Sequence, residues 1–279
     1  MDISVVIPTH NRAHTLPRAL DSVLGQAVPP AEIIVVNDGS TDTTAGLLAE
    51  RYPQVRCLSM GNQGVSAARN AGIRAARGEW IALLDSDDAW KPEKLAQQMR
   101  LIRDHSGHRL CHTGEIWIRR GVRVNPMKKH AKRGGHIFRD CLPLCVISPS
   151  SALLRRDLLD DIGLFDEELP ACEDYDLWLR VCAREPVLFV DAPLTVKYGG
   201  HEDQLSRRHW GMDRFRITAL EKVLASGQLG EDDRAAAAAT LVEKARILAC
   251  GALKRGKTER AAFYRELGAR YATSAASRA

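Results

Sequence analysis

The sequence predicts an α/β fold built on a largely parallel sheet. Short apolar, β-branched runs alternate with amphipathic stretches over the first 110 residues, and polar residues follow the runs rather than interrupt them. This alternation at short spacing is typical of βαβ units. The chain has 279 residues, 45% hydrophobic and 27% charged, as expected for an ordinary soluble globular protein with a sizeable core.

The first half of the chain reads as four strands, each followed by a helix. A strand at residues 3–7 is closed by Pro8, and apolar residues at helical spacing then predict a helix at 16–24. The run at 80–84 has no polar residue, which indicates a strand buried on both faces. The remaining strands are expected at 33–36 and 55–58, and the remaining helices at 45–51, 65–77 and 92–104.

After residue 110 the alternation loosens. Strands are expected at 112–118, 147–154, 187–190 and 194–198, and a helix with acids in its first turn at 173–180. From about Gly211 the chain should be helical, with an αα-hairpin formed by 234–254 and 257–273. A single hairpin cannot bury its own apolar face, so it should dock on the main domain or on a second copy of the chain in a homo-oligomer.

Composition excludes several classes of protein. No window is apolar enough for a membrane span, and the N-terminus does not resemble a signal peptide. Seven cysteines without a CxxC pair argue against a disulfide framework or a zinc site, so Cys141 and Cys145 are expected to be small core residues. These features together predict a cytoplasmic protein.

The net charge of +5 is concentrated locally. Residues 116–139 contain no acid, and they carry eight cations: Arg119, Arg120, Arg123, Lys128, Lys129, Lys132, Arg133 and Arg139. Such a stretch can face phosphates or the surface of an anionic membrane, or it can be a solvated loop. It lacks the interleaved aromatic residues of a nucleic-acid platform, so no nucleic-acid partner is expected.

Polar motifs follow three of the predicted strands: Pro8-Thr9-His10-Asn11-Arg12, Asp38-Gly39-Ser40 and Asp85-Ser86-Asp87. In parallel sheets ligands bind beyond the carboxyl ends of the strands, so these motifs should share one edge. Asp85, Asp87 and Asp88 offer oxygen ligands to a hard divalent cation. The alternative is a polar loop whose Asp caps the helix that opens near Pro92.

Motifs of other nucleotide and hydrolase sites are absent. There is no GxxxxGK[ST], no GxGxxG after a strand, no GxSxG and no HExxH. The motifs present, in order, are VVIPTHNR, VVNDGSTD, GNQGVSAARNAG, LLDSDD and CEDYDLWLR. This series resembles the family 2 glycosyltransferases over residues 1–206. The resemblance implies a GT-A fold with a Rossmann-like mixed sheet, a nucleotide-binding half at 1–110, an acceptor half at 111–206 and a helical extension at 207–279.

The resemblance also implies roles for individual residues. Asp38 would hydrogen-bond the base, and Arg69 would approach the diphosphate or the base. Asp85, with Ser86 beside it, would lie near the ribose and the metal, and Asp87 would bind the metal directly. His201 would be a further metal ligand. The other expected roles are the nucleotide pocket, lined by Pro8, Thr9, Asn11 and Arg12, and the catalytic base, drawn from Asp174 and Glu173.

The implied activity is inverting transfer of a sugar from a nucleotide-diphosphate donor, with UDP expected, assisted by Mn²⁺ or Mg²⁺. A cation would neutralise the leaving diphosphate and a carboxylate would deprotonate the acceptor hydroxyl. The acceptor is expected to be a glycan or a lipid-linked molecule of the cell envelope. The segment KYGGHEDQLSRRHW differs from the sequence motif that is commoner at this place in the family. No QxxRW motif of processive synthases is present. Two alternatives are a sugar nucleotidyltransferase-like enzyme and a non-catalytic, GT-A-like module that binds polyanions.

Overall fold

The structure is a computed structural model that describes residues 1–125, 127, 130–200 and 209–276. By their contacts these residues form two compact units. The sheet unit contains residues 1–136, 146–170 and 185–202, and the helical unit contains residues 137–145, 171–184 and 203–279. The predicted domain boundary after residue 206 lies outside the described residues and stays a prediction.

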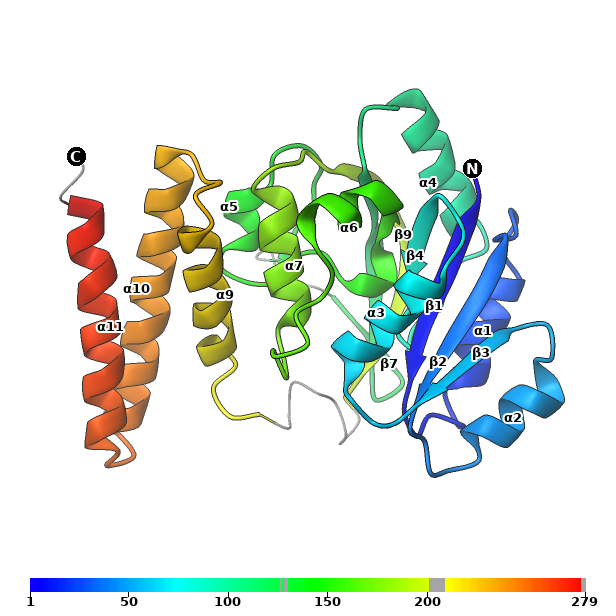
Figure 1. Cartoon of the computed structure of the whole chain (residues 1–279), viewed down its shortest axis with the longest axis horizontal. Coiled ribbons are helices and arrows are strands. Elements are labelled where there is room, and N and C mark those ends of the chain that lie inside the picture. The colour runs from blue at the N-terminus through cyan, green and yellow to red at the C-terminus, as the bar shows by residue number, and fades with distance from the viewer. Residues whose placement is uncertain (126, 128–129, 201–208, 277–279) are drawn as a thin grey trace. The chain divides into compact units, whose positions relative to one another are not determined.

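The first half of the sheet unit is parallel, as predicted. The strands lie in the order β3-β2-β1-β4, with β1 paired in parallel to β2 and to β4 (Figure 1). Their bounds are β1 Ile3–Thr9, β2 Glu32–Asp38, β3 Arg56–Met60 and β4 Trp80–Leu83. The helices are α1 Leu16–Leu24, α2 Thr44–Arg51, α3 Val65–Ala75 and α4 Lys94–Asp104. All eight predicted elements are confirmed, with ends that differ by a few residues.

The second half of the sheet is mixed, and two sequence predictions are wrong there. Residues 147–154 are not one strand, because Pro149 lacks an N–H and begins the 3₁₀ turn η2 (Pro149–Ser151). Only β8 (Leu153–Arg155) pairs with β4. The strands expected at 187–190 and 194–198 are a single strand, β9 (Leu188–Gly199), and Pro193 lies at a bulge in its pairing with β6 (Leu110–Arg119).

Gly114 makes that bulge possible. A Cβ atom at this position would lie 2.8 Å from the carbonyl oxygen of Ala192. Two short strands that the sequence analysis missed complete the sheet: β5 (Ala89–Trp90) pairs with β9, and β7 (Val122–Val124) turns back on β6 within the basic stretch. Helix α6 (Arg156–Ile162) was also missed.

A buried lysine lies beside the core of the sheet unit. The Lys94 side chain is fully buried, its Nζ donates to Gln98 Oε1 at 2.8 Å, and it lies 4.0 Å from the ring centroid of Trp90. Gln98 in turn donates to the carbonyl oxygens of Cys111 and Ser151. Burial lowers the pKa of Lys94 to about 7. This polar cluster joins α4 to β6.

The helical unit confirms the predicted C-terminal half. Its helices are α5 Phe138–Cys141, α7 Glu173–Cys182, α9 Asp213–Ala225, α10 Glu231–Leu253 and α11 Thr258–Ala276. Helices α10 and α11 form the predicted hairpin, which packs against α9 rather than standing alone. Cys141 is a core residue, as expected, whereas Cys145 is only half-buried. Trp178 is also buried in the core of this unit. No helix among the described residues is long and apolar enough to cross a membrane.

Candidate functional site

The loops after β1 and β2 are joined by hydrogen bonds at the carboxyl edge of the parallel strands. Asn11 has φ +52°, in the left-handed region that Asn tolerates better than most residues. Its backbone N–H donates to Ser40 Oγ at 2.9 Å, and its side-chain carbonyl accepts from the N–H groups of Thr41 and Asp42. The Arg12 N–H donates to Thr44 Oγ1. Asn11 and Arg12 therefore fix the shape of this edge.

Asp38 connects the end of β2 to the start of α3. Its side chain is buried, and its two carboxylate oxygens accept from the N–H groups of Gln63 and Gly64 at 2.8 and 2.9 Å. Each oxygen keeps a second lone pair, so Asp38 can still accept the predicted hydrogen bond from a nucleotide base. Gly39 next to it has φ +67°, and a Cβ there would lie 2.7 Å from the Asn62 nitrogen.

Arg69 joins α3 to the acidic loop after β4. It is buried, its Nη2 lies 2.6 Å from Asp85 Oδ1, and its guanidinium lies 5.1 Å from the ring centroid of Phe165. Arg69 is therefore not a residue of a solvated helix face. Burial opposes ionisation of Asp85, but the charges of Arg69 and Lys197 outweigh it and hold the pKa of Asp85 below its usual range.

The acidic loop is held from three sides. Ser150 Oγ accepts from the Asp85 N–H at 3.1 Å and donates to Asp88 Oδ2 at 2.6 Å. The Tyr198 N–H donates to the other oxygen of Asp88. Arg18 donates to the Asp87 carbonyl oxygen at 2.7 Å and stacks on the Tyr198 ring at 3.6 Å. These contacts fix the backbone that carries the two half-buried carboxylates expected to bind metal.

Asp88 differs from the other two acids. Its side chain is buried, and burial together with the charges of Asp87 and Asp85 raises its pKa, against the opposing effects of Lys197 and Ser150. Both oxygens are used in hydrogen bonds within the fold. Asp88 therefore supports the loop, while Asp85 and Asp87 remain the candidates for metal binding.

The donor set fits a divalent cation that also binds substrate. Among the described residues, no three His, Cys, Asp or Glu side chains gather as a complete metal centre. Mg²⁺ and similar ions are commonly held by one or two carboxylates plus substrate phosphates, and Asp85 and Asp87 supply such a pair. His201, the third predicted ligand, lies outside the described residues.

Two hydroxyl groups near the same edge are buried without hydrogen-bond partners. They are Thr9 Oγ1, at the end of β1, and Ser66 Oγ, in the first turn of α3. A buried hydroxyl without a partner is costly, which suggests that a ligand supplies one. Pro8 and Ser86, the other predicted pocket residues, are also buried. Thr9, Pro8 and Ser86 stay predictions as ligand contacts.

The predicted catalytic carboxylates lie in the first turn of α7, in the helical unit. Glu173 is buried, and Asp174 is half-buried. Asp174 Oδ1 accepts from the Tyr175 N–H at 2.7 Å, and its Oδ2 lies 3.3 Å from Cys145 Sγ, which donates to it. Such a carboxylate can accept a proton, as a general base must.

Comparison with known proteins decides the family. Residues 4–163 match the family model described as glycosyl transferase family 2. The chain belongs to this family. A relative described as an uncharacterized glycosyltransferase from Rickettsia felis is 30% identical over 213 residues, which cover 74% of this chain and 35% of that protein. The chain thus spans about a third of the length of that relative.

Solved structures confirm the predicted GT-A glycosyltransferase fold. S. aureus TarS in complex with UDP-GlcNAc has a TM-score of 0.66 at 17% identity, covering 95% of this chain and 91% of that one. The mannosyltransferase PcManGT from Pyrobaculum calidifontis, in complex with GDP-Man and Mn²⁺, has a TM-score of 0.63 at 18% identity, covering 98% and 85%. At these identities the likeness concerns the fold alone.

Three residues that support the site of this family 2 glycosyltransferase were missed by sequence reasoning. Ser150, Lys197 and Arg18 reach the acidic loop from η2, β9 and α1. Nothing in the local sequence marks them. Ser150 lies 65 residues from Asp85 and 62 from Asp88, Lys197 lies still farther along the chain from Asp85, and Arg18 is on a helix that reads as an ordinary amphipathic one. Only the order of strands in the sheet brings them together.

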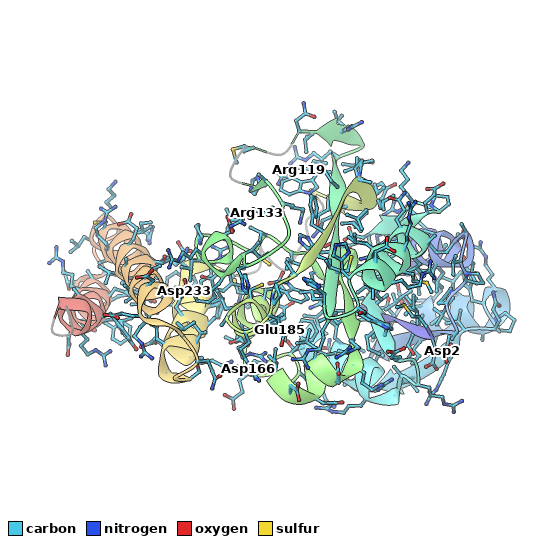
Figure 2. The ribbon with its side chains drawn as sticks, turned by 90° about the horizontal axis from the view of Figure 1, so that it is seen from above. Asp2, Arg119, Arg133, Asp166, Glu185 and Asp233 are labelled. Carbon is cyan, nitrogen blue, oxygen red and sulfur yellow. The ribbon has the colours of Figure 1, made fainter. Side chains whose placement is uncertain are left out.

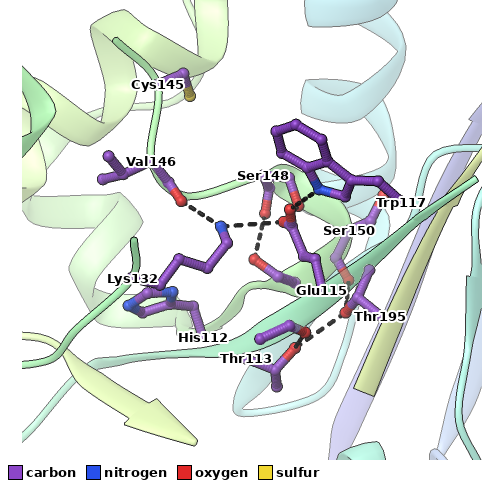
Figure 3. Close-up of polar contacts among 12 residues, drawn as sticks. His112, Thr113, Glu115, Trp117, Lys132, Cys145, Val146, Ser148, Ser150 and Thr195 are labelled. Carbon is purple, nitrogen blue, oxygen red and sulfur yellow. Dashed lines mark hydrogen bonds and ion pairs between the residues drawn. The ribbon is translucent and has the colours of Figure 1, made fainter. Parts of the chain in front are cut away.

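Part of the predicted basic stretch serves the fold. Lys132 Nζ lies 3.1 Å from Glu115 Oε1, the acid that immediately precedes the stretch, and Ser148 and Trp117 also donate to Glu115 (Figure 3). Burial opposes ionisation here, but Lys132, Lys197 and these hydrogen bonds lower the pKa of Glu115 to about 2.

Other cations of the stretch differ in their surroundings. Arg119 and Arg133 are labelled in Figure 2, and the Arg119 guanidinium lies 5.7 Å from the ring centroid of Trp117. In the helical unit, Arg139 pairs with Asp233 at 2.6 Å. The stretch is therefore not one uniformly solvated loop, since two of its cations form ion pairs.

Proposed function

We propose that this glycosyltransferase moves a sugar from a nucleotide-diphosphate donor, a UDP-sugar in the first instance, to a hydroxyl group of a glycan or lipid-linked acceptor. The observation that carries the proposal is the joined sheet edge, where Asp38, Arg69 and Asp85 link three loops at the carboxyl ends of parallel strands. That edge is where open α/β sheets bind nucleotides. The fold shared with structures that hold UDP-GlcNAc or GDP-Man supports it.

The charges around the acidic loop suit a leaving diphosphate. Arg69 and Lys197 bring positive charge to Asp85, and Arg18 fixes the Asp87 backbone. Asp87 and Asp85 would hold Mn²⁺ or Mg²⁺, which when bound would neutralise charge on the diphosphate as a Lewis acid. The Mn²⁺ in the PcManGT complex supports this choice of ion. The buried hydroxyl groups of Thr9 and Ser66 would donate to the bound nucleotide.

The acceptor step would need one carboxylate. We assign it to Asp174, which would take the proton of the acceptor hydroxyl as that oxygen attacks the anomeric carbon, with Glu173 as the alternative. Attack on the face opposite the leaving diphosphate, in a single displacement, would invert the anomeric carbon. The Cys145 thiol that donates to Asp174 would orient this carboxylate. The relatives named above give no support to a nucleotidyltransferase or to a non-catalytic module.

Calorimetric titration with UDP, with and without Mn²⁺, tests the donor half of this proposal. Asp87→Ala should weaken metal-dependent binding at least about tenfold, because a direct ligand is lost. Asp191→Ala is the matched control, since Asp191 is an exposed acid of the same unit with no interaction among the described residues. Parallel titrations with GDP and dTDP identify the base. Absence of binding by all three nucleotides would overturn the proposal.

A further inference from the structure

One end of the helical unit gathers positive charge. Helix α9 begins at the same end at which α10 turns into α11 (Figure 1). We call this the basic end and define it by five cations: Arg214, Lys254, Arg255, Lys257 and Arg260. Residues 251–264 contain a single acid, Glu259. The contact of Arg260 in α11 with Trp210, just before α9, confirms that these segments are adjacent.

The five cations have no acidic partners in the part of the chain that the structure describes. Other cations of the same unit do: Arg216 and Lys244 pair with Asp213, and Lys222 pairs with Asp176. Ion pairs are therefore available in this unit, and the basic end lacks them. Within the described residues, no acid compensates its charge.

Two of the cations share one exposed aromatic side chain. The guanidinium groups of Arg214 and Arg260 lie 4.6 and 4.3 Å from the ring centroid of Trp210, whose side chain is 45% exposed. Two like charges on one indole repel each other, although the ring attracts each of them. The Nε of Arg214 is buried without a hydrogen-bond partner. An anion beside the guanidinium groups would relieve their mutual repulsion.

The dipole of α11 does not favour the cations at its N-terminus. A helix N-terminus carries partial positive charge and favours acids, yet Lys257 directly precedes α11 and Arg260 lies in its first turn. Lys254 and Arg255 are explained by the C-terminus of α10, where cations are favourable. Lys257 and Arg260 are not explained by helix stability.

Exposed apolar side chains accompany the charge. Leu253, the last residue of α10, is 39% exposed, and Phe263, one turn after Arg260, is 57% exposed. A soluble phosphate compound would need the cations alone. Tryptophan and other apolar side chains beside a cluster of Lys and Arg are typical of surfaces that bind the interface of an anionic bilayer. Lipid phosphates would meet the arginines, and Trp210 and Leu253 would enter the headgroup region.

We propose that the basic end binds the surface of a bilayer that contains anionic phospholipids. This assigns a membrane contact to the turn between α10 and α11, outside the stretch 119–139, in which Lys132 and Arg139 are paired within the fold. The inference does not depend on the proposed donor or acceptor, because none of its residues belongs to the sheet edge.

Co-sedimentation with vesicles tests the proposal, using phosphatidylcholine alone and phosphatidylcholine mixed with phosphatidylglycerol. Wild type should bind only the mixed vesicles, and added salt should weaken the binding. Arg260→Glu should reduce affinity at least about tenfold, since it reverses one charge at the contact. Arg265→Glu is the matched control, being an exposed arginine of the same helix, also without an ion pair among the described residues. It should bind as wild type does.

Three results would overturn the proposal. The first is no binding of wild type to mixed vesicles. The second is an equal loss in Arg260→Glu and Arg265→Glu, which would indicate only a general charge effect. The third is binding of soluble inorganic polyphosphate at the basic end without vesicle binding, which would indicate a site for a soluble polyanion. Unchanged circular dichroism and thermal unfolding of both variants would show that each is folded.

Discussion

At the sheet edge, Arg69 and Asp85 are buried against each other at 2.6 Å, whereas at the basic end Arg214 and Arg260 lie on one exposed indole without an acid beside them among the described residues. At the sheet edge, the charges of Arg69 and Asp85 hold two loops together and are also proposed to lie next to the bound nucleotide. At the basic end, Arg214 and Arg260 contact an aromatic ring, and none of the five cations forms an ion pair among the described residues. A charged residue can therefore be assigned to the fold, to a ligand or to both by the partners it already has.

The largest difference between an effect on turnover and an effect on stability is expected for the two acids in the first turn of α7. Asp174→Asn should reduce UDP release from a UDP-sugar by about a thousandfold, because the amide cannot accept the acceptor's proton. UDP affinity and thermal stability should stay at the wild-type level. Glu173→Gln is the comparison variant. If Glu173→Gln abolishes turnover and Asp174→Asn does not, the general base is Glu173 and the assignment to Asp174 is contradicted.

Lys94 is a titratable group that affects the stability of the fold and has no proposed contact with a ligand. The folded protein releases the Lys94 proton near pH 7, and an unfolded lysine releases it near pH 10, so the unfolded chain binds more protons between these values. The free energy of unfolding should therefore rise with pH across this window, by roughly 4 kcal/mol from this group. Lys94→Met should remove that rise and be more stable than wild type at pH 7. Denaturant titrations at several pH values measure both, and parallel curves for the two proteins would contradict the pKa of Lys94.

Arg69 is expected to serve both roles. Arg69→Met removes the ion pair of Asp85 with Arg69, which should cost about 3 kcal/mol in the free energy of unfolding and also weaken UDP binding. Arg246→Met removes an exposed partner of Glu243 in α10 and should leave thermal unfolding unchanged. Chemical denaturation and calorimetry of the two variants give the comparison. Equal stability of Arg69→Met and wild type would show that the Arg69–Asp85 pair does not hold the loops together.

Ser150 gives the smallest expected effect on stability. Ser150→Ala removes one hydrogen bond to the Asp85 N–H and one to Asp88, at a cost of about 2 kcal/mol. Metal-dependent UDP affinity should fall several-fold, since the acidic loop loses its support. Ser151→Ala is the control, because this neighbouring buried hydroxyl donates only to the Ser148 carbonyl. A fall in UDP affinity in both variants would indicate general loosening instead.

The sequence predicts the sheet edge well because its chemistry is local. The buried run at 80–84 and the acids behind it are adjacent in the chain, and so are β2 and Asp38. Ser150 and Lys197 could not be found in this way, because their partners are brought close only by the pairing of β8 with β4 and of β9 with β6. The break at Pro149 and the bulge at Pro193 were missed for a related reason: a proline lowers strand propensity, but the position of the neighbouring strand decides whether it ends a strand or bends it.

The basic end shows a different limit of sequence reasoning. The sequence predicts the hairpin of 234–254 and 257–273, but the cations at its turn do not stand out in the sequence beside the eight at 119–139. Two of those eight cations, Lys132 and Arg139, form ion pairs, whereas none of the five at the basic end does so among the described residues. The partner acids, Glu115 for Lys132 and Asp233 for Arg139, lie outside the acid-free residues 116–139.

The most direct test of the account is hydrogen–deuterium exchange with and without UDP and Mn²⁺. The account predicts slower exchange in peptides covering 8–13, 37–44, 61–70 and 85–90, which carry the loops at the carboxyl ends of the strands. Exchange at the α10–α11 turn should be unchanged. Protection confined to the helical unit, or none at saturating UDP, would contradict the assignment of the nucleotide site to this edge.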